Sequence, residues 1–284
     1  MGKKFVKIKK QILSLSNLEK ILYPGLKIRK VQILDYYLKV SSLMIPFLKN
    51  FPLVRVRCPN GIERCFWEKE KPKGIPDWIK TKDIFSSHLK KSVSYIICNN
   101  LETLIWLVNL AVIEFHPWLA PIDNLDQPKF ILFDLDPLEA VSFKDISKVA
   151  LLIKKILDEL NYKSFAKTTG LSGIHIYALN KKRYNFDQSR EFVKDVAKIL
   201  DKFYPELIAL DKKQRKGVYI DWQQNSKGKT AVAPFSLRAN SFATIAVPLR
   251  WERLKRGIDP KNYNLLNYSK WLFKTNYDFL QDFA

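Results

Sequence analysis

Apolar and polar residues alternate along the chain with two different periods, which predict strands and helices in turn over nearly its whole length. Short apolar or alternating runs predict strands at residues 53–58, 93–98, 129–136, 173–179, 218–221, 230–235 and 242–249. Apolar spacings of three and four predict helices at residues 33–48, 103–115, 146–160 and 189–203, with a short helix near the C-terminus. Asn99 and Glu102 have the spacing of a capping box before the second of these helices.

Several of the predicted strands follow one another too closely for a crossover helix to lie between them. This favours an α+β fold, with a mixed or antiparallel β-sheet flanked by helices, over a doubly wound sheet. The Pro-rich residues 71–78 and the basic residues 211–217 predict loops. Loops on a rigid sheet are where an enzyme of nucleic acids places many of its substrate contacts.

The strand at residues 129–136 ends in two aspartates, Asp134 and Asp136, directly before a proline. Side chains alternate along a strand, so both carboxylates point to one face while Phe133 and Leu135 point to the other. Two carboxylates this close repel each other at neutral pH unless a cation lies between them, and hard oxygen ligands suit Mg²⁺ or Mn²⁺. The pair predicts a metal site, with a solvated strand end as the simpler alternative.

A second apolar strand, at residues 218–221, also ends in an aspartate, Asp221. A third carboxylate lets two metal ions lie about 3.5–4 Å apart and hold both the attacking and the leaving oxygen of a phosphoryl transfer. Asp221 alone is a weak signal. Together with Asp134 and Asp136 it predicts a two-metal site.

Residues 168–175 (TTGLSGIH) form a segment rich in hydroxyl groups and glycine. Glycines leave backbone N–H groups free for close approach by phosphate, and His175 adds a further donor where the next strand begins. A plain hairpin turn has a similar composition, so the segment indicates phosphate binding only beside the aspartates.

The charge of the chain indicates the kind of partner. A formal net charge of +21 favours phosphate-rich partners and salt-dependent binding, although a protein from an unusually basic proteome would share it. No membrane partner is expected, because no apolar run reaches the about 18 residues that a spanning helix needs. Cys58, Cys65 and Cys98 stand at unrelated spacings and suggest neither a disulfide framework nor a zinc site. We therefore expect a reducing cytoplasm.

Several ordered segments resemble a known family. FDLDP, TTGLSGIHIYAL, YIDWQQNSKGKTAVAPFSLRAN and ATIAVPLRWE look like the polymerase domain of bacterial ligase D and its stand-alone archaeal relatives, within the archaeo-eukaryotic primase superfamily. SNLEKILYP, RCPNGIERCFWEK and EFHPW extend the resemblance through the N-terminal half. The resemblance implies one catalytic domain over residues 1–284, with an N-terminal helical segment (1–50) that binds a 5′-phosphate and a catalytic core (51–284).

The resemblance also implies an activity. It is a template-directed polymerase or primase for DNA end joining, which fills gaps, extends ends, favours ribonucleotides and uses two Mn²⁺ or Mg²⁺ ions. Its substrates are nucleoside triphosphates and DNA with gaps, overhangs or broken ends bearing a 5′-phosphate. A Ku-type end-binding protein is the implied partner and the prokaryotic nucleoid the implied location. The chain has no Lys-x-Asp-Gly ligase motif, so a separate DNA ligase is expected.

Individual residues acquire roles from the same resemblance. The catalytic metal-ligand positions are filled by Asp134, Asp136 and Asp221. The positions that contact the incoming nucleotide are filled by His116, Thr169, His175, Arg238 and, as a candidate phosphate contact, Lys69. The aromatic pair that stacks near the templating base is Phe66 and Trp67. The two lysines that hold the 5′-phosphate across a gap are Lys20 and Lys30.

Some of these positions depart from the family or have a simpler explanation. Ser172 stands where the family has a basic residue, which leaves one triphosphate contact open. His116 also fits a satisfied core histidine, and Arg238 also fits a partner for an internal carboxylate. Lys20 and Lys30 also fit a solvated basic surface.

Two other classes of protein remain as alternatives. A phosphatase of the haloacid-dehalogenase type also uses an apolar strand that ends in Asp-x-Asp, but it has Thr or Val where Leu138 stands. A non-catalytic nucleic-acid-binding module explains the charge but not three aspartates at strand ends. Incorporation of a labelled nucleotide into a primer separates these classes.

Overall fold

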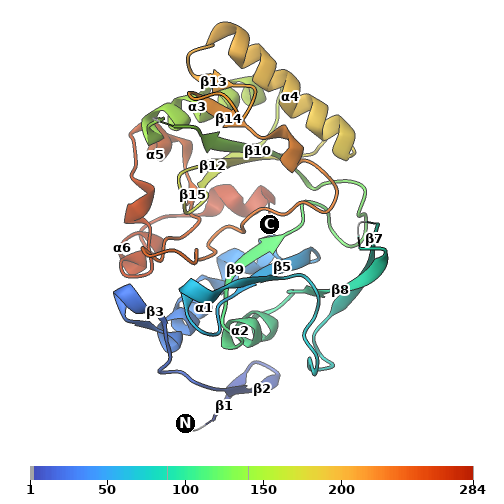
Figure 1. The fold of residues 1–284 in the computed structure, drawn as a ribbon, viewed down its shortest axis with the longest axis vertical. Coiled ribbons are helices and arrows are strands. Elements are labelled where there is room, and N and C mark those ends of the chain that lie inside the picture. The colour runs from blue at the N-terminus through green and yellow to red at the C-terminus, as the bar shows by residue number, and fades with distance from the viewer. Residues whose placement is uncertain (1–2, 88, 140, 284) are drawn as a thin grey trace.

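A six-stranded β-sheet makes up the upper half of the molecule in Figure 1, and its central strand carries two of the aspartates. The computed structural model describes residues 3–87, 89–139 and 141–283. The strands lie in the order β13 (Ile208–Ala209), β14 (Val218–Ile220), β10 (Phe130–Pro137), β12 (Ile174–Leu179), β11 (Ser164–Thr168) and β15 (Pro248–Leu249). All neighbours are antiparallel except β13 and β14.

A second sheet lies in the lower half of Figure 1. Its strands are β6 (Phe66–Glu68), β5 (Pro52–Arg57), β8 (Lys91–Ile97) and β7 (Thr81–Ser86), and β9 (Val112–Pro117) also pairs with β5. Two small hairpins precede it, β1 (Lys4–Ile8) with β2 (Gln11–Leu15) and β3 (Ile21–Tyr23) with β4 (Ile28–Arg29).

Helices cover the two sheets. They are α1 (Lys30–Met44), α2 (Leu101–Asn109), α3 (Phe143–Glu159), α4 (Phe186–Phe203), α5 (Trp251–Lys255) and α6 (Tyr268–Leu272). The helices α3 and α4 pack on the upper sheet, and the ring of Phe133 meets that of Phe192 at 6.1 Å. A mixed upper sheet and an antiparallel lower sheet, together with the helices, confirm the predicted α+β fold. Across the described ranges, no helix combines the length and the apolar character needed to cross a membrane.

The predicted helix over residues 103–115 is wrong in its second half. The helix α2 ends at Asn109, Ala111 takes a left-handed conformation (φ 61°), and Val112 begins β9. A left-handed residue ends a helix, and the β-branched residues that follow suit a strand that can pair with β5. The cap is also one residue later than predicted, because Asn100 accepts the N–H of Thr103.

Asn99 has another task in the structure. Its side chain accepts the N–H of Asn50 and donates to the side-chain oxygen of the same residue. The apolar run over residues 103–115 thus contains the end of a helix, a left-handed turn and the start of a strand. A continuous apolar pattern does not show where one of these elements ends and the next begins.

The strands predicted at residues 230–235 and 242–249 are reduced to β15 and isolated bridges. Pro234 and Pro248 have no N–H to donate to a ladder, and Phe235 (φ 65°) and Ala243 (φ 47°) turn the backbone out of the extended region. The segments are nevertheless buried and hydrogen-bonded, for example from the N–H of Phe235 to the carbonyl of Ala246 at 2.7 Å.

Residues 1–50 are not uniformly helical as predicted, since two hairpins precede α1. Short hairpins joined by tight turns give too few alternating positions to stand out in the sequence. The cysteines also differ from expectation, because Cys58 and Cys65 form a disulfide that closes the loop before β6. The two positions are seven apart, a spacing that indicates no known disulfide framework by itself.

Candidate active site

Strand pairing brings the three aspartates together at neighbouring strand ends. Residues 135–137 of β10 pair with residues 218–220 of β14, so the chain reaches Asp221 directly beside Asp134. The N–H of Asp221 donates to the carbonyl of Asp134 at 2.8 Å. Along β10 the side chains of Phe133 and Leu135 are fully buried, whereas Asp134 and Asp136 line a pocket. The predicted alternation is therefore confirmed.

The pocket has a volume of about 250 Å³ and draws residues from both sheets. Trp67 and His116 come from the lower sheet, and Asp134 and His175 come from the upper sheet. Arg238 and the residues around Thr169 complete its wall. Most of the residues that the family resemblance assigns to metal and nucleotide are thus gathered at one place.

Lys212, which the sequence did not single out, lies between two of the carboxylates. Its ammonium nitrogen is 2.9 Å from Oδ2 of Asp221 and 3.4 Å from Oδ2 of Asp136. Burial lowers the pKa of Lys212, but the two carboxylates outweigh it and raise the pKa above its ordinary value. Burial and repulsion from Asp134 raise the pKa of Asp136. The ammonium group of Lys212, from the basic loop at residues 211–217, therefore balances part of the negative charge of the acidic cluster.

The aspartates fit a divalent cation by their chemistry but are not assembled around one position. In the described parts of the chain, no three side chains of Asp, Glu, His or Cys converge closely enough to form a metal site. Asp136 and Asp221 face Lys212, while Asp134 is held by His175. A lysine ammonium between two carboxylates occupies the kind of place that a hard cation takes. The oxygen donors therefore suit a hard divalent cation such as Mg²⁺ or Mn²⁺ by their chemistry, whereas their arrangement places them around Lys212 and His175.

His175 lies opposite Asp134 in the pairing of β12 with β10. Its Nε2 is 3.2 Å from Oδ1 of Asp134, and burial, followed by repulsion from Lys167, lowers the pKa of His175 to about 4. Burial would raise the pKa of Asp134, yet His175 and Lys167 leave it below its ordinary value. At neutral pH a neutral imidazole therefore donates to an ionised carboxylate.

The glycine-rich turn is closed by its own hydroxyl group. The N–H groups of Leu171 and Gly173 both donate to Oγ1 of Thr169 at 3.2 Å, and the N–H of Thr169 donates to the carbonyl of Gly173. The threonine hydroxyl thus already accepts these N–H groups, while the turn still lines the pocket, and phosphate binding by the turn stays a prediction. A Cβ at Gly173 would lie 2.6 Å from the carbonyl oxygen of Leu135, so glycine is needed for close packing against β10.

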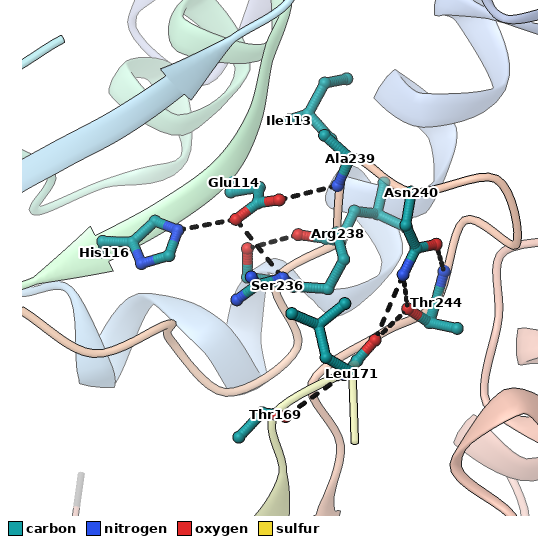
Figure 2. Close-up of polar contacts among 12 residues, drawn as sticks. Ile113, Glu114, His116, Thr169, Leu171, Ser236, Arg238, Ala239, Asn240 and Thr244 are labelled. Atoms are coloured by element: carbon teal, nitrogen blue, oxygen red, sulfur yellow. Dashed lines mark hydrogen bonds and ion pairs between the residues drawn. The ribbon is translucent and has the colours of Figure 1, made fainter. Parts of the chain in front are cut away.

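Glu114 joins two of the predicted nucleotide contacts and was also missed. Figure 2 shows its carboxylate between His116 and Arg238. Oε2 lies 2.8 Å from Nε2 of His116 and 3.4 Å from Nε of Arg238, and Oε1 accepts the N–H of Ala239 at 2.7 Å. Burial would raise the pKa of Glu114, but these partners lower it. Glu114 thus supplies the internal carboxylate partner that was the alternative to phosphate binding for Arg238, and it also pairs with the buried His116.

Both side chains nevertheless line the pocket as well. Within the described residues, the side chain of Arg238 makes an ion pair with Glu114 through Nε at 3.4 Å, and its terminal guanidinium nitrogens make no hydrogen bond. Glu114 and His116 are two positions apart on β9, so their side chains share one face. A Glu-x-His pattern on an apolar strand was the signal that could have identified this glutamate.

Lys167 is a second buried residue that the sequence did not identify. It lies on β11, its side chain is fully buried, and its ammonium group donates to the carbonyl of Thr168 at 3.3 Å. Burial, together with repulsion from Arg238, lowers its pKa well below the ordinary value. In its charged form this lysine favours the ionised form of Asp134.

The aromatic pair separates in the structure. Trp67 is exposed, lines the pocket and stands 4.6 Å from His116 between ring centroids, at an interplanar angle of 56°. Phe66 is outside the pocket lining and lies under the guanidinium of Arg57 at 5.5 Å. Lys69 lines a different cavity, of about 660 Å³, beside Trp118. Of these three residues, only Trp67 is placed to meet a nucleotide in the aspartate pocket.

Lys20 and Lys30 are brought together outside the pocket. The N–H of Lys30 donates to the carbonyl of Lys20, and the side chains donate to Asn60 and to the carbonyl of Ser16. Lys30 is buried, and burial together with repulsion from Lys20 lowers its pKa to about 8. The turn at Pro24–Leu26 folds the backbone of the two residues back toward each other.

Comparison with known proteins gives the class of the protein. Residues 29–278 match the family described as "LigD, primase-polymerase domain". The chain therefore belongs to the primase-polymerase domain family of ligase D.

Particular relatives agree with this membership. A "Multifunctional non-homologous end joining protein LigD" of Mycolicibacterium smegmatis is 31% identical over 84% of this chain and 32% of its own length. A "Bifunctional non-homologous end joining protein LigD" of Bacillus subtilis is 30% identical over 89% of this chain and 41% of its own length. The chain thus spans about a third of the length of the curated relatives it matches.

A solved structure is similar over nearly its full extent. The polymerase domain from Mycobacterium tuberculosis ligase D in complex with DNA matches with a TM-score of 0.85 and 28% identity. The match covers 95% of this chain and 97% of that chain.

Proposed function

We propose that this protein is a metal-dependent, template-directed nucleotidyltransferase that fills gaps and extends broken ends during DNA end joining. The observation that carries the proposal is the meeting of Asp134, Asp136 and Asp221 at neighbouring strand ends. They meet beside a pocket that also presents Arg238 and Trp67. Family membership supports it, since relatives are named as end-joining proteins and the similar solved domain is in complex with DNA.

Asp134, Asp136 and Asp221 would hold two Mn²⁺ or Mg²⁺ ions. Bound there, such ions lower the pKa of a primer 3′-hydroxyl and neutralise charge on a triphosphate. Lys212 would have to leave its place between Asp136 and Asp221 for a divalent cation to bind there, since both would compete for the same oxygens. His175 would keep Asp134 oriented, with its neutral imidazole donating to the ionised carboxylate.

The pocket residues suit a nucleoside triphosphate. The terminal nitrogens of Arg238 can donate to phosphate oxygens, while Glu114 fixes the direction of the guanidinium. Trp67 offers an exposed ring for a base, and its contact with His116 limits its rotation. The preference for ribonucleotides comes from the family resemblance, and no described residue is assigned to a 2′-hydroxyl.

The pair Lys20 and Lys30 would hold the 5′-phosphate on the far side of a gap. Two ammonium groups that repel each other gain from an anion between them, and a terminal phosphate carries more charge than an internal diester. A Ku-type end-binding protein and a DNA ligase activity, on a partner or elsewhere in the same polypeptide, complete the proposed reaction at the nucleoid.

Nucleotide addition to a gapped duplex tests the proposal. Ribonucleotides and deoxyribonucleotides are compared with Mn²⁺ or Mg²⁺ present, and with the downstream end carrying a phosphate or a hydroxyl. Extension that needs metal and template, and that is faster with ribonucleotides and with a 5′-phosphate, supports every part. Absence of extension under all conditions would favour a non-catalytic nucleic-acid-binding module. Faster extension with deoxyribonucleotides would overturn only the proposed preference for ribonucleotides.

The phosphatase alternative loses its support. It rested on Asp-x-Asp at the end of an apolar strand, and that strand now belongs to a chain of the primase-polymerase family. The strand β10 also lies between antiparallel neighbours, β12 and β14.

A further inference from the structure

A cavity of about 470 Å³ lies at the edge of the upper sheet, between β15 and the C-terminal helices α5 and α6. These elements form the orange and red region at the left of Figure 1. The cavity shares no lining residue with the aspartate pocket, and it is larger than that pocket. Its size is within the range of about 300–1,000 Å³ that small-molecule sites occupy.

The inner wall of this C-terminal cavity is apolar and aromatic. Val247 and Leu249 of the sheet edge are buried, and Tyr263 and Tyr277 are nearly so. Trp271 is half-buried, and its ring meets that of Tyr263 edge-on at 5.4 Å between centroids. Nε1 of Trp271 donates to Asn267 at 3.1 Å, which fixes the indole plane. The wall therefore presents a held aromatic ring against which a planar group can stack.

The other lining side chains are strongly basic. Four of them carry a positive charge, namely Arg250, Arg253, Lys270 and Lys274, and none of the lining residues is acidic. Arg250 is paired with Asp278 and donates to the carbonyl of Asn276 at 3.0 Å.

The remaining three cations lack such neutralisation. Among the described residues, the side chains of Arg253, Lys270 and Lys274 make no ion pair or hydrogen bond. Cations gathered around an apolar wall repel one another, and a ligand that brings negative charge relieves that repulsion. The fitting ligand combines an anionic group with a flat apolar one.

The wall is also joined to the aspartate pocket through the backbone. Leu249 and Pro248 pair with Ala166 and Lys167 of β11. The N–H of Thr168 donates to the carbonyl of Val247 at 3.0 Å, and the N–H of Val247 donates to Oγ1 of Thr168 at 3.0 Å. The next residue, Thr169, closes the turn of the aspartate pocket. Both cavities thus adjoin the same strand pair.

We propose that the C-terminal cavity is a second nucleotide-binding site. It takes one nucleotide unit, with the base against Trp271 and the phosphate among Arg253, Lys270 and Lys274. The unit comes from a free mononucleotide or from a single-stranded stretch of DNA, since both present the same base and phosphate. This proposal goes beyond the proposed catalytic function and does not depend on it, because the C-terminal cavity shares no lining residue with the aspartate pocket.

Photochemical labelling of the full chain tests the site without any reaction by the enzyme. Two probes are used in the presence of a metal chelator, azidoadenosine monophosphate and a short oligodeoxythymidylate that contains iodouracil. Peptide mapping then locates the adducts. We expect adducts within residues 263–277. Adducts from the mononucleotide alone identify a free nucleotide as the ligand, and adducts from the oligonucleotide alone identify a DNA strand.

Variants decide whether the basic residues create the site. Arg253→Gln with Lys274→Gln is expected to lower labelling of residues 263–277 about five- to tenfold, because two charge-assisted phosphate contacts are lost. The matched control, Lys144→Gln with Lys155→Gln, removes the same charge from exposed positions on α3 and should stay within about twofold. Trp271→Leu, which keeps an apolar side chain, should lower labelling as well, with thermal unfolding verifying that it folds.

The proposal is overturned if neither probe labels residues 263–277. It is equally overturned if both charge variants lower labelling to the same extent, since only the overall charge would then matter. Failure of the catalytic proposal would show as absent primer extension and would leave these labelling results unchanged.

Discussion

The aspartate pocket and the Lys20–Lys30 pair both hold like charges close together, but they resolve the repulsion differently. In the aspartate pocket, the loop residue Lys212 places its ammonium between Asp136 and Asp221. In the lysine pair, the hydrogen-bond partners that the two side chains have among the described residues are an amide oxygen and a backbone carbonyl. Burial and the neighbouring ammonium lower the pKa of Lys30 to about 8.

The two regions differ in the counter-charge that the protein itself supplies. The aspartate cluster has an internal substitute for a cation, so a divalent ion has to displace it. Among the described residues, no carboxylate forms an ion pair with the lysine pair, so an incoming anion would meet uncompensated positive charge. Under the proposed function, the first region would exchange cations and the second would capture an anion.

The largest expected effect comes from removing a carboxylate. Asp134→Ala, Asp136→Ala or Asp221→Ala should lower nucleotide addition at least about a thousandfold, because each removes an oxygen ligand from the proposed two-metal site. Gapped-DNA affinity should stay within about twofold, since binding comes from the basic surface. Single-turnover extension with saturating Mn²⁺ measures the first quantity and anisotropy the second.

The matched control is Asp195→Ala, an exposed aspartate of α4 outside the pocket. It should extend like the unchanged protein. Substantial extension by one of the three pocket variants would remove the metal-ligand role from that aspartate.

The next effect concerns the anion side of the comparison. Lys20→Ala with Lys30→Ala should weaken binding to a 5′-phosphorylated gap roughly ten- to a hundredfold, as expected for one or two charge-assisted hydrogen bonds. Binding to the same gap with a 5′-hydroxyl should change much less. Anisotropy titrations at one near-physiological salt concentration give both affinities.

Lys7→Ala with Lys10→Ala serves as the control, since both lysines are exposed in the nearby hairpin. Equal weakening of both DNA substrates by Lys20→Ala with Lys30→Ala would assign these lysines to the nonspecific basic surface.

What the sequence predicted and what it missed follow from the range of the interactions. Alternation along one strand correctly separated Asp134 and Asp136 from Phe133 and Leu135, because that pattern is local. Glu114 and Lys212 were missed, since each has one partner that is distant in sequence. Arg238 is brought to Glu114 by an irregular buried segment, and Asp136 lies 76 positions before Lys212.

Two local contacts were also invisible in the sequence. The Thr169 turn has the composition of a phosphate loop, but composition does not reveal that its own hydroxyl accepts the N–H groups of Leu171 and Gly173. The disulfide between Cys58 and Cys65 depends on a tight turn between them that composition does not reveal. Fold class was predictable from the spacing of strands, whereas the neutralisation of buried charge was not.

A third prediction removes the charge of Glu114 and keeps its shape. Glu114→Gln should lower kcat/KM for nucleotide about twentyfold, mainly through a higher KM, because Arg238 and His116 lose the carboxylate that orients them. Affinity for gapped DNA should be unchanged. Steady-state kinetics at varied nucleotide concentration measure the effect.

Glu102→Gln provides the matched control, because Glu102 is also buried but lies on α2 outside the pocket. An unchanged KM in Glu114→Gln, or an equal rise in the control, would show that the contacts of Glu114 serve stability alone.

A fourth prediction uses pH to weaken the lysine pair without mutation. Burial and repulsion from Lys20 lower the pKa of Lys30 to about 8, and a bound phosphate raises it again because it favours the charged form. Binding therefore takes up a proton, and selectivity for the 5′-phosphate should fall up to about tenfold between about pH 7 and 9. Anisotropy with the phosphorylated and hydroxyl-ended gaps, measured in parallel, gives this ratio.

Unfolding does not explain such a loss. A lysine whose pKa is lower in the folded chain binds its proton more tightly when unfolded, so its contribution to stability rises with pH. Lys30→Arg, whose guanidinium stays charged, should keep its selectivity across this range. Selectivity that is constant with pH in the unchanged protein would contradict the placement of Lys30 in the phosphate site.

The smallest effect is expected at Lys212, the residue that distinguishes the two regions. Its side chain is 54% exposed, and ion pairs at such positions contribute about 0.2–1 kcal/mol. A divalent ion that displaces it loses that amount, so Lys212→Ala should lower the Mn²⁺ concentration for half-maximal binding about two- to fivefold. Calorimetric titration without nucleotide measures this directly, and Lys213→Ala, which removes the adjacent lysine, is the control. If Lys212→Ala instead requires more Mn²⁺, the lysine assists metal binding rather than competing with it, and the contrast between an exchangeable cation site and an open anion site fails.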